Sequence, residues 1–110
     1  MGPSVNFDNL RDITGGDVEM ESELFQLFLT SSSECIDGLH AAHTSGDENA
    51  WRDHAHAFKG ICYNLGAQPL GQICKKAQDD CHATSEEKGI MLTDMEAELK
   101  NVKQALAEHK

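Results

Sequence analysis

Apolar residues recur at alternating steps of four and three along most of the chain. This spacing places each set on one face of an α-helix, because the helix turns once every 3.6 residues. Four such stripes are present: Leu24, Phe28, Ser31, Cys35 and Leu39; Trp51, Ala55, Phe58, Cys62 and Leu65; Leu70, Cys74, Ala77 and Cys81; and Leu92, Met95, Leu99, Val102 and Leu106. Alternating β-branched residues and Asn-Gly turns, which are typical of β-hairpins, are absent from the sequence. The sequence therefore predicts an all-α fold.

Helix start and stop signals separate these stripes. Asp17 and Asp47 each follow a glycine and carry the short carboxylate that suits a helix N-cap. Gly66 can end the second long helix. Capping boxes occur at residues 84–87 and again at residues 93–96, so the sequence leaves the start of the last helix open.

A short helix of its own is expected before the first stripe, from about Phe7 to Ile13. The connections between the stripes are only a few residues long, so successive helices should be antiparallel neighbours. The fold prediction is an antiparallel up-and-down four-helix bundle with a short N-terminal helix.

The chain is long enough for one hydrophobic core and too short for two. It has 110 residues, of which 39% are hydrophobic and 25% are charged, so we expect a single domain over residues 1–110. The opening Met-Gly-Pro-Ser is unlike the rest of the chain. We expect residues 1–4 to be disordered or left over from cloning.

The acidic charge balance limits the partners. A formal net charge of -10 repels nucleic acids and anionic membrane surfaces. No apolar run reaches the roughly 18 residues needed to cross a bilayer, and no secretion signal opens the chain. We expect a cytoplasmic protein that binds no nucleic acid and does not insert into a membrane.

The stretch HAFKGICYNLGA, residues 56–67, holds a histidine and a mid-helix glycine on one face. At about 100° per residue from the centre of the second stripe, His56 falls about 140° away and Gly60 about 180° away, so both should face solvent. His54 falls about 60° from the centre, at the edge of the core, where a hydrogen-bonded packing role is expected. A glycine inside an exposed helix costs about 1 kcal/mol relative to alanine. Because Gly60 should bury nothing in return, we interpret the bare backbone beside His56 as functional.

A surface imidazole beside bare backbone suits phosphoryl transfer. The neutral ring is a nucleophile near pH 7 and needs no base to deprotonate it first. Gly60 leaves space for another protein's active site, and Lys59 can offset the negative charge of a phosphoryl group. On spacing alone, a surface histidine beside an incidental glycine stays an open alternative.

The same residues resemble the signature of a known family. The segment His56-Ala57-Phe58-Lys59-Gly60 is followed by Asn64-Leu65-Gly66-Ala67 and then by Leu70 and Cys74. This order is similar to the H-x-x-K-G, N-L-G-A and L-x-x-x-C pattern of the histidine-containing phosphotransfer (HPt) domain. The short leading helix, the Gly-Gly-Asp entry to the first long helix and the Ala-His step into the motif also resemble that family, so the likeness extends across the chain.

The resemblance implies a carrier in a multistep phosphorelay. Such domains accept a phosphoryl group from the aspartate of a receiver domain and pass it to another receiver aspartate. His56 would then be the phosphorylated residue, Lys59 the charge partner and Gly60 the source of steric clearance. The chain itself would need no cofactor and no nucleotide, because the magnesium ion belongs to the receiver. The expected partners are response-regulator receiver domains and a hybrid sensor histidine kinase, and the chain should be a monomer that ATP alone does not label.

Two positions depart from the family pattern. Ile61 and Cys62 stand where small polar residues often follow the Lys-Gly pair, and Ala77-Gln78 stands where Leu-Glu is frequent. The sequence therefore leaves open which polar group supports the imidazole.

Two other functions stay open on the sequence. A helical module that has lost phosphotransfer could still dock on receiver domains. A metal-binding bundle could use His40, His43, His54 or the cysteines. Against the metal site, His40 and His43 share a helix face without a third ligand, and no Cys-x-x-Cys pair is present. We expect small buried thiols at Cys35, Cys62, Cys74 and Cys81.

Overall fold

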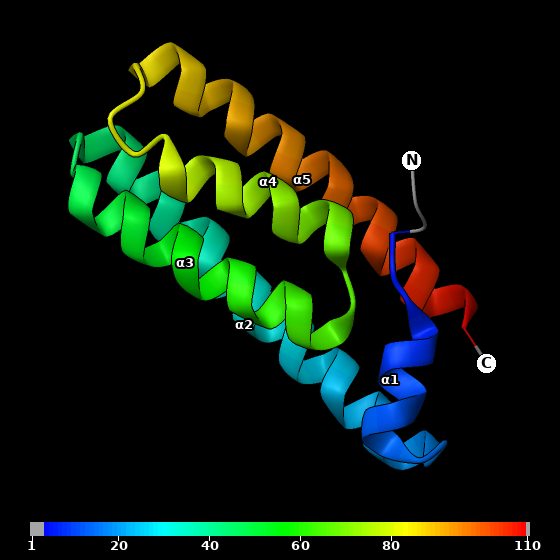
Figure 1. The fold of residues 1–110 in the computed structure, drawn as a ribbon. Helices are drawn as coiled ribbons and strands as arrows, with labels where there is room; N and C mark the ends of the chain where they lie inside the picture. The colour runs from blue at the N-terminus through cyan, green and yellow to red at the C-terminus, as the bar shows by residue number, and fades with distance from the viewer. Residues whose placement is uncertain (1–3, 110) are drawn as a thin grey trace.

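The computed structural model describes residues 4–109, without the side chain of Asn9. This part of the chain contains five α-helices and no β-strand (Figure 1). The helices are α1 (Phe7–Thr14), α2 (Val18–Ser45), α3 (Glu48–Leu65), α4 (Gln68–Asp79) and α5 (Ser85–Glu108). The predicted all-α bundle with a short N-terminal helix is confirmed.

The four long helices close into a bundle. In it α2 packs against α3, α3 against α4 and α4 against α5, and α5 completes the ring by contacting α2. The short connections make successive helices alternate in direction, as the ribbon in Figure 1 shows. The short α1 packs against α2, at the end of the bundle where α5 finishes. The molecule is elongated, with principal extents of 42 × 25 × 19 Å.

Local capping sets the helix ends. Asp17 Oδ1 accepts hydrogen bonds from two backbone N–H groups of α2, at 3.0 and 3.2 Å, and Asp47 Oδ1 accepts one from α3 at 3.0 Å. Gly66 ends α3 with a φ of +93°, a left-handed conformation that favours glycine. Thr84 Oγ1 accepts from the N–H of Glu87 at 3.1 Å, so the first of the two capping boxes begins the last helix.

The core contains most of the residues in the four predicted stripes. The buried members are Phe28, Leu39, Trp51, Ala55, Phe58, Cys62, Leu65, Leu70, Cys74, Ala77, Leu92, Met95, Leu99, Val102 and Leu106. The remaining four, Leu24, Ser31, Cys35 and Cys81, are half-buried. Cys81 does not belong to the α4 stripe as predicted, because α4 ends at Asp79 and Cys81 lies in the turn that follows.

The four cysteines are free thiols. Cys62 and Cys74 are fully buried, in agreement with the sequence, whereas Cys35 and Cys81 are half-buried. A hydrogen bond with the Cys74 thiol, together with burial, raises the pKa of Cys62 well above its usual range. Burial also raises the pKa of Cys35. Both thiols therefore stay protonated at neutral pH.

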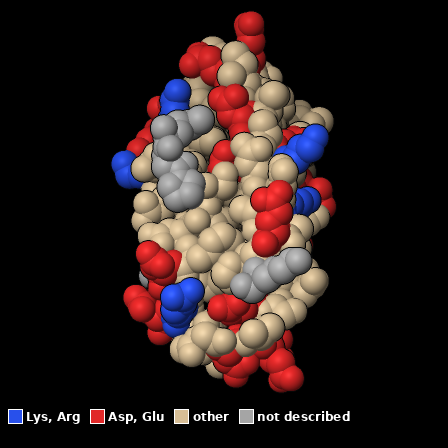
Figure 2. Space-filling view, turned by 90° about the vertical axis from the view of Figure 1, so that its right-hand side faces the viewer, with Lys and Arg blue, Asp and Glu red and all other residues tan. Residues whose placement is uncertain are grey.

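Acidic side chains are distributed unevenly over the surface. Figure 2 shows acidic side chains toward both ends of one face and along its right-hand side, around an area without charged side chains. Within residues 4–109, no helix has the length and apolar character needed to cross a membrane. The sequence predicts that residues 1–4 are disordered or left over from cloning. Positions 1–3 lie outside the described residues, and Ser4 is half-buried.

Candidate functional site

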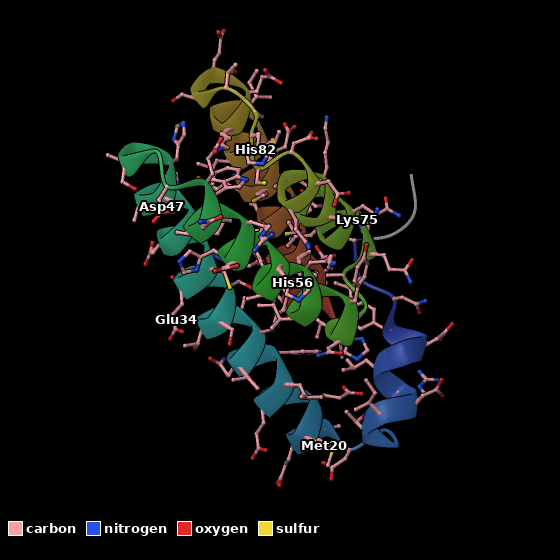
Figure 3. All side chains as sticks on the ribbon, turned by 60° about the vertical axis from the view of Figure 1, so that its left-hand side comes forward. Met20, Glu34, Asp47, His56, Lys75 and His82 are labelled. Carbon is pink, nitrogen blue, oxygen red and sulfur yellow. The ribbon has the colours of Figure 1, made fainter. Side chains whose placement is uncertain are left out.

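His56 and Gly60 lie one turn apart on the outer face of α3. Both are exposed, while Ala55 and Phe58 on the opposite face are fully buried. Figure 3 shows His56 on the outer side of α3, away from the bundle interior. A Cβ atom built on Gly60 would meet no atom within 4 Å. Both residues face solvent as the helical wheel predicts, and no packing contact within the described chain requires a glycine at position 60.

Gln78 of α4 contacts the His56 imidazole. The Nδ1 atom of His56 lies 3.3 Å from Oε1 of Gln78. The two helices run antiparallel from the turn at Gly66 and Ala67, so residues at similar distances from that turn lie side by side. A carbonyl oxygen can only accept, so a hydrogen bond at this contact requires the proton on Nδ1. In that tautomer the lone pair of Nε2 is free.

Lys59 is the cation on α3 without a nearby acid. It is half-buried and follows His56 by three residues, which places the two side chains on neighbouring positions of the helix surface. Arg52 lies 3.9 Å from Asp53, and Lys75 on α4 lies 3.5 Å from Asp79. In the described part of the chain, no acidic side chain comes within 4 Å of the Lys59 ammonium group.

His54 faces the opposite way, toward α2. It is half-buried, as its position at the edge of the predicted core requires. A Cβ atom built on Gly38 of α2 would lie 2.5 Å from Cε1 of the His54 ring, so the glycine allows the ring to pack against the α2 backbone. The predicted packing role is confirmed. The expected hydrogen bond is not, because the ring makes none with residues 4–109.

Comparison with known proteins shows to which family the chain belongs. The Hpt domain family matches residues 23–109 of the chain. The chain belongs to the Hpt family. Among solved structures it is similar to histidine-containing phosphotransfer protein B (HptB) from Pseudomonas aeruginosa PAO1, with 28% identity and a TM-score of 0.84 over 100% of both chains. No curated protein matches the sequence significantly. The two matches together identify a histidine phosphotransfer protein of a phosphorelay.

The two matches differ in whether they include α1. The Hpt family match begins at residue 23, inside α2, and so leaves α1 out. The match to HptB covers the whole chain and includes α1. Residues 56–74, which carry the motif, therefore lie in the part that both comparisons cover, whereas α1 is covered by the match to HptB alone.

The histidines considered for a metal site have other contacts. His40 Nε2 lies 2.7 Å from Oε1 of Glu96, and His43 Nε2 lies 2.8 Å from the backbone carbonyl oxygen of Ser85. His54 packs against Gly38 of α2. Among residues 4–109 of this Hpt domain, no group of three or more His, Cys, Asp or Glu side chains is placed to hold a metal ion.

An apolar groove of the Hpt domain lies next to the face of α3 that carries His56 and Gly60. It encloses about 350 Å³ between α1, α2 and α3. Its walls include Leu10 and Ile13 of α1, Leu24 and Leu27 of α2, and Ile61 and Asn64 of α3. Leu27 is 62% exposed and Ile13 is 53% exposed, so large apolar side chains here are open to solvent. Because His56, Gly60 and Asn64 follow at steps of four, they form one row on α3 that ends at the groove.

Gln78 and the groove had no predicted role. The sequence offered one signal for Gln78, its distance from the α3–α4 turn, which matches that of His56 on the other side. For the groove the only sequence signal was the apolar character of Ile13 and Leu27 at positions outside the stripes. Neither signal is decisive without the rotation of the helices.

Proposed function

We propose that His56 of this Hpt domain accepts a phosphoryl group from a receiver aspartate and passes it to the aspartate of another receiver. The observation that carries this proposal is the exposed imidazole whose Nδ1 faces the Gln78 carbonyl oxygen at 3.3 Å. That contact orients the ring and leaves Nε2 as the nucleophile. Gln78 thus fills the supporting role that the sequence left open.

The transfer needs no base from this chain. The Nε2 lone pair attacks the phosphorus of the aspartyl phosphate, and the N–P bond forms as the P–O bond to the aspartate breaks. The electron pair of that bond returns to the aspartate as its carboxylate. The Nδ1 proton stays on the ring and keeps its hydrogen bond to Gln78. The reverse sequence delivers the phosphoryl group to a second receiver.

Lys59 and Gly60 act on this step in different ways. The Lys59 ammonium group, which has no acidic neighbour within 4 Å in the described chain, can approach the phosphoryl oxygens and offset their charge. Gly60 keeps the space next to the ring empty, since a Cβ there would meet nothing within 4 Å. The incoming receiver can therefore bring its aspartate against the imidazole.

The apolar groove is the docking surface that we assign to the receiver. From His56 to Asn64 the distance along α3 is about 12 Å, at about 1.5 Å per residue. An ordinary protein interface covers about 800 Å² on each partner, so a receiver centred on His56 also covers the groove. Its exposed leucine and isoleucine side chains would then be buried, as the apolar centre of an interface usually is.

The remaining partners follow from the same proposal. The magnesium ion belongs to the receiver, and this chain contributes no cofactor. A hybrid sensor histidine kinase can supply the first receiver. We place the protein in the cytoplasm as a monomer. Its net charge of -10 opposes binding to nucleic acids.

The decisive experiment is incubation of the purified protein with a panel of phosphorylated receiver domains. We expect at least one receiver to label the protein through a bond that is labile in acid and stable in alkali, as a phosphoramidate is. ATP alone should leave the protein unlabelled, and self-labelling by ATP would indicate a kinase.

A docking module without phosphotransfer is the second candidate function. It would bind receivers through the same groove, so binding alone does not separate the two. Receivers that bind the chain, none of which ever labels it, would support the docking module and exclude the carrier.

A further inference from the structure

The residue after α5 ties three helices together at one end of the bundle. The His109 ring stacks on Phe7 of α1, with centroids 4.0 Å apart and planes 5° from parallel. It also meets Phe25 of α2 edge-on, at 6.0 Å and 73°. Its Nε2 atom lies 3.2 Å from Oε2 of Glu21, and the two side chains are only 20% and 14% exposed. We call these four residues the C-terminal clamp.

The C-terminal clamp contacts α1 through Phe7, and α1 needs such contacts to keep its position. With eight residues, α1 is too short to form a stable helix without contacts from the rest of the protein. One anchor is the Leu10 side chain, which is 1% exposed. Another is the backbone hydrogen bond from Asn6 N–H to the Gly66 carbonyl oxygen, at 2.8 Å. The stack on Phe7, the first residue of α1, is a third and is the one supplied by the far end of the chain.

The position of α1 determines the shape of the apolar groove. Leu10 lies one turn after Phe7 on the same helix, and Ile13 lies one turn further. These two residues form the α1 wall of the groove. A displacement of Phe7 therefore moves that wall relative to α2 and α3. It leaves His56, Gln78 and Lys59 untouched, because they lie on α3 and α4.

We propose that His109 is a positioning residue for receiver docking. By stacking on Phe7 it fixes the α1 wall of the groove and so sets how tightly a receiver domain binds, without taking part in the transfer at His56. The inference rests on the proposed function, since it assumes that a receiver occupies the groove. It assigns the end of α5 a role in partner affinity that is separate from the chemistry.

The test is the rate of transfer from a phospho-receiver to the full chain, measured by rapid quench over a range of receiver concentrations. In His109→Ala we expect the half-saturating receiver concentration to rise about fivefold, the usual size for loss of one aromatic stacking contact. The maximal rate should not change. His109→Phe keeps the stack on Phe7 and should restore the wild-type value.

Two controls separate docking from other effects. Phosphoramidate, a small donor that needs no docking, should label His56 at the same rate in wild type and in His109→Ala. His40→Ala removes another histidine paired with a glutamate, in the distant half of α2, and should leave the half-saturating concentration unchanged. If His109→Ala is unfolded at the assay temperature, Phe7→Leu removes the same stack from the other side and should give the same rise.

The outcomes distinguish failure of this inference from failure of the proposed function. An unchanged half-saturating concentration in folded His109→Ala, or in Phe7→Leu where that variant is used, would refute the clamp. So would a fall in the maximal rate together with slower labelling by phosphoramidate. Failure of the proposed function would appear earlier, as a wild-type protein that no phospho-receiver labels.

Discussion

The two sides of α3 each pair a histidine with a glycine, and the two pairs differ in what surrounds them. On the inner side, a Cβ on Gly38 would lie 2.5 Å from the His54 ring. On the outer side, a Cβ on Gly60 would meet no atom within 4 Å. The first glycine is explained by the contact between α2 and α3, whereas the fold alone does not explain the second.

This difference separates a glycine that packing requires from one that packing within the described chain does not require. Gly38 makes room for a side chain of the same molecule, so its loss should be measured in stability. Under the proposed function Gly60 leaves room for the receiver, so its loss should be measured in transfer. His54 and His56 divide in the same way, although only one residue lies between them.

The largest expected effect is on the two histidines themselves. His56→Gln should abolish phosphoryl acceptance from a cognate phospho-receiver, because it removes the nucleophilic ring nitrogen. His54→Gln should keep acceptance and lose only some stability, because the ring packs against α2 and not toward solvent. Labelling with a phospho-receiver and thermal melting of both variants give the answer. Label retained in His56→Gln would show that another residue accepts the phosphoryl group.

The second-largest effect is expected for a large side chain at position 60. Gly60→Gln should slow transfer about thirtyfold, or about 2 kcal/mol of barrier, because the side chain obstructs the approaching receiver. Gly60→Ala should instead stabilise the isolated domain by up to about 1 kcal/mol, since the added methyl group meets nothing and alanine favours the helix. Rapid-quench transfer and denaturant unfolding measure the two effects. Normal transfer in Gly60→Gln would show that the site needs no clearance.

The corresponding change on the inner side should act on stability alone. Gly38→Ala should lower the free energy of unfolding by about 1.5 kcal/mol, because overpacking against the His54 ring outweighs the gain in helix propensity. In a His54→Ala background the same change should cost less, since the ring is gone. Denaturant unfolding of the four proteins in this cycle tests the coupling. Equal costs in both backgrounds would contradict the contact.

The smallest effect concerns charge. Lys59→Ala should slow transfer about tenfold, or about 1.4 kcal/mol, because it removes one partly solvated charge from the phosphoryl oxygens and leaves the nucleophile in place. The loss should shrink at high salt, which screens exposed charges. Lys75→Ala, which removes a cation already placed 3.5 Å from Asp79, is a suitable control with a smaller expected loss. An unchanged rate at two ionic strengths would remove Lys59 from the site.

The parts of the site that were predicted are those that depend on one helix. The periodicity of apolar residues fixed which face of α3 is buried, and so predicted that His56 and Gly60 face solvent and that His54 lies at the core edge. The capping roles of Asp17 and Asp47 could also be predicted from the sequence, because a cap acts on backbone groups within three residues of itself. The choice between the two capping boxes was not, because both satisfy the same local pattern.

The parts that needed the tertiary structure join residues that are distant in the sequence. Gln78 reaches His56 across 22 positions, and His109 reaches Glu21 across 88. Such contacts depend on the rotation and the register of each helix, which are set by packing of the whole core and not by any local pattern. The sequence by itself thus determined the helices, the helix ends at Asp17, Asp47 and Gly66, and the outward direction of His56. Only the packed bundle decided which residue orients the imidazole, which glycine serves packing and how α1 comes to line the groove.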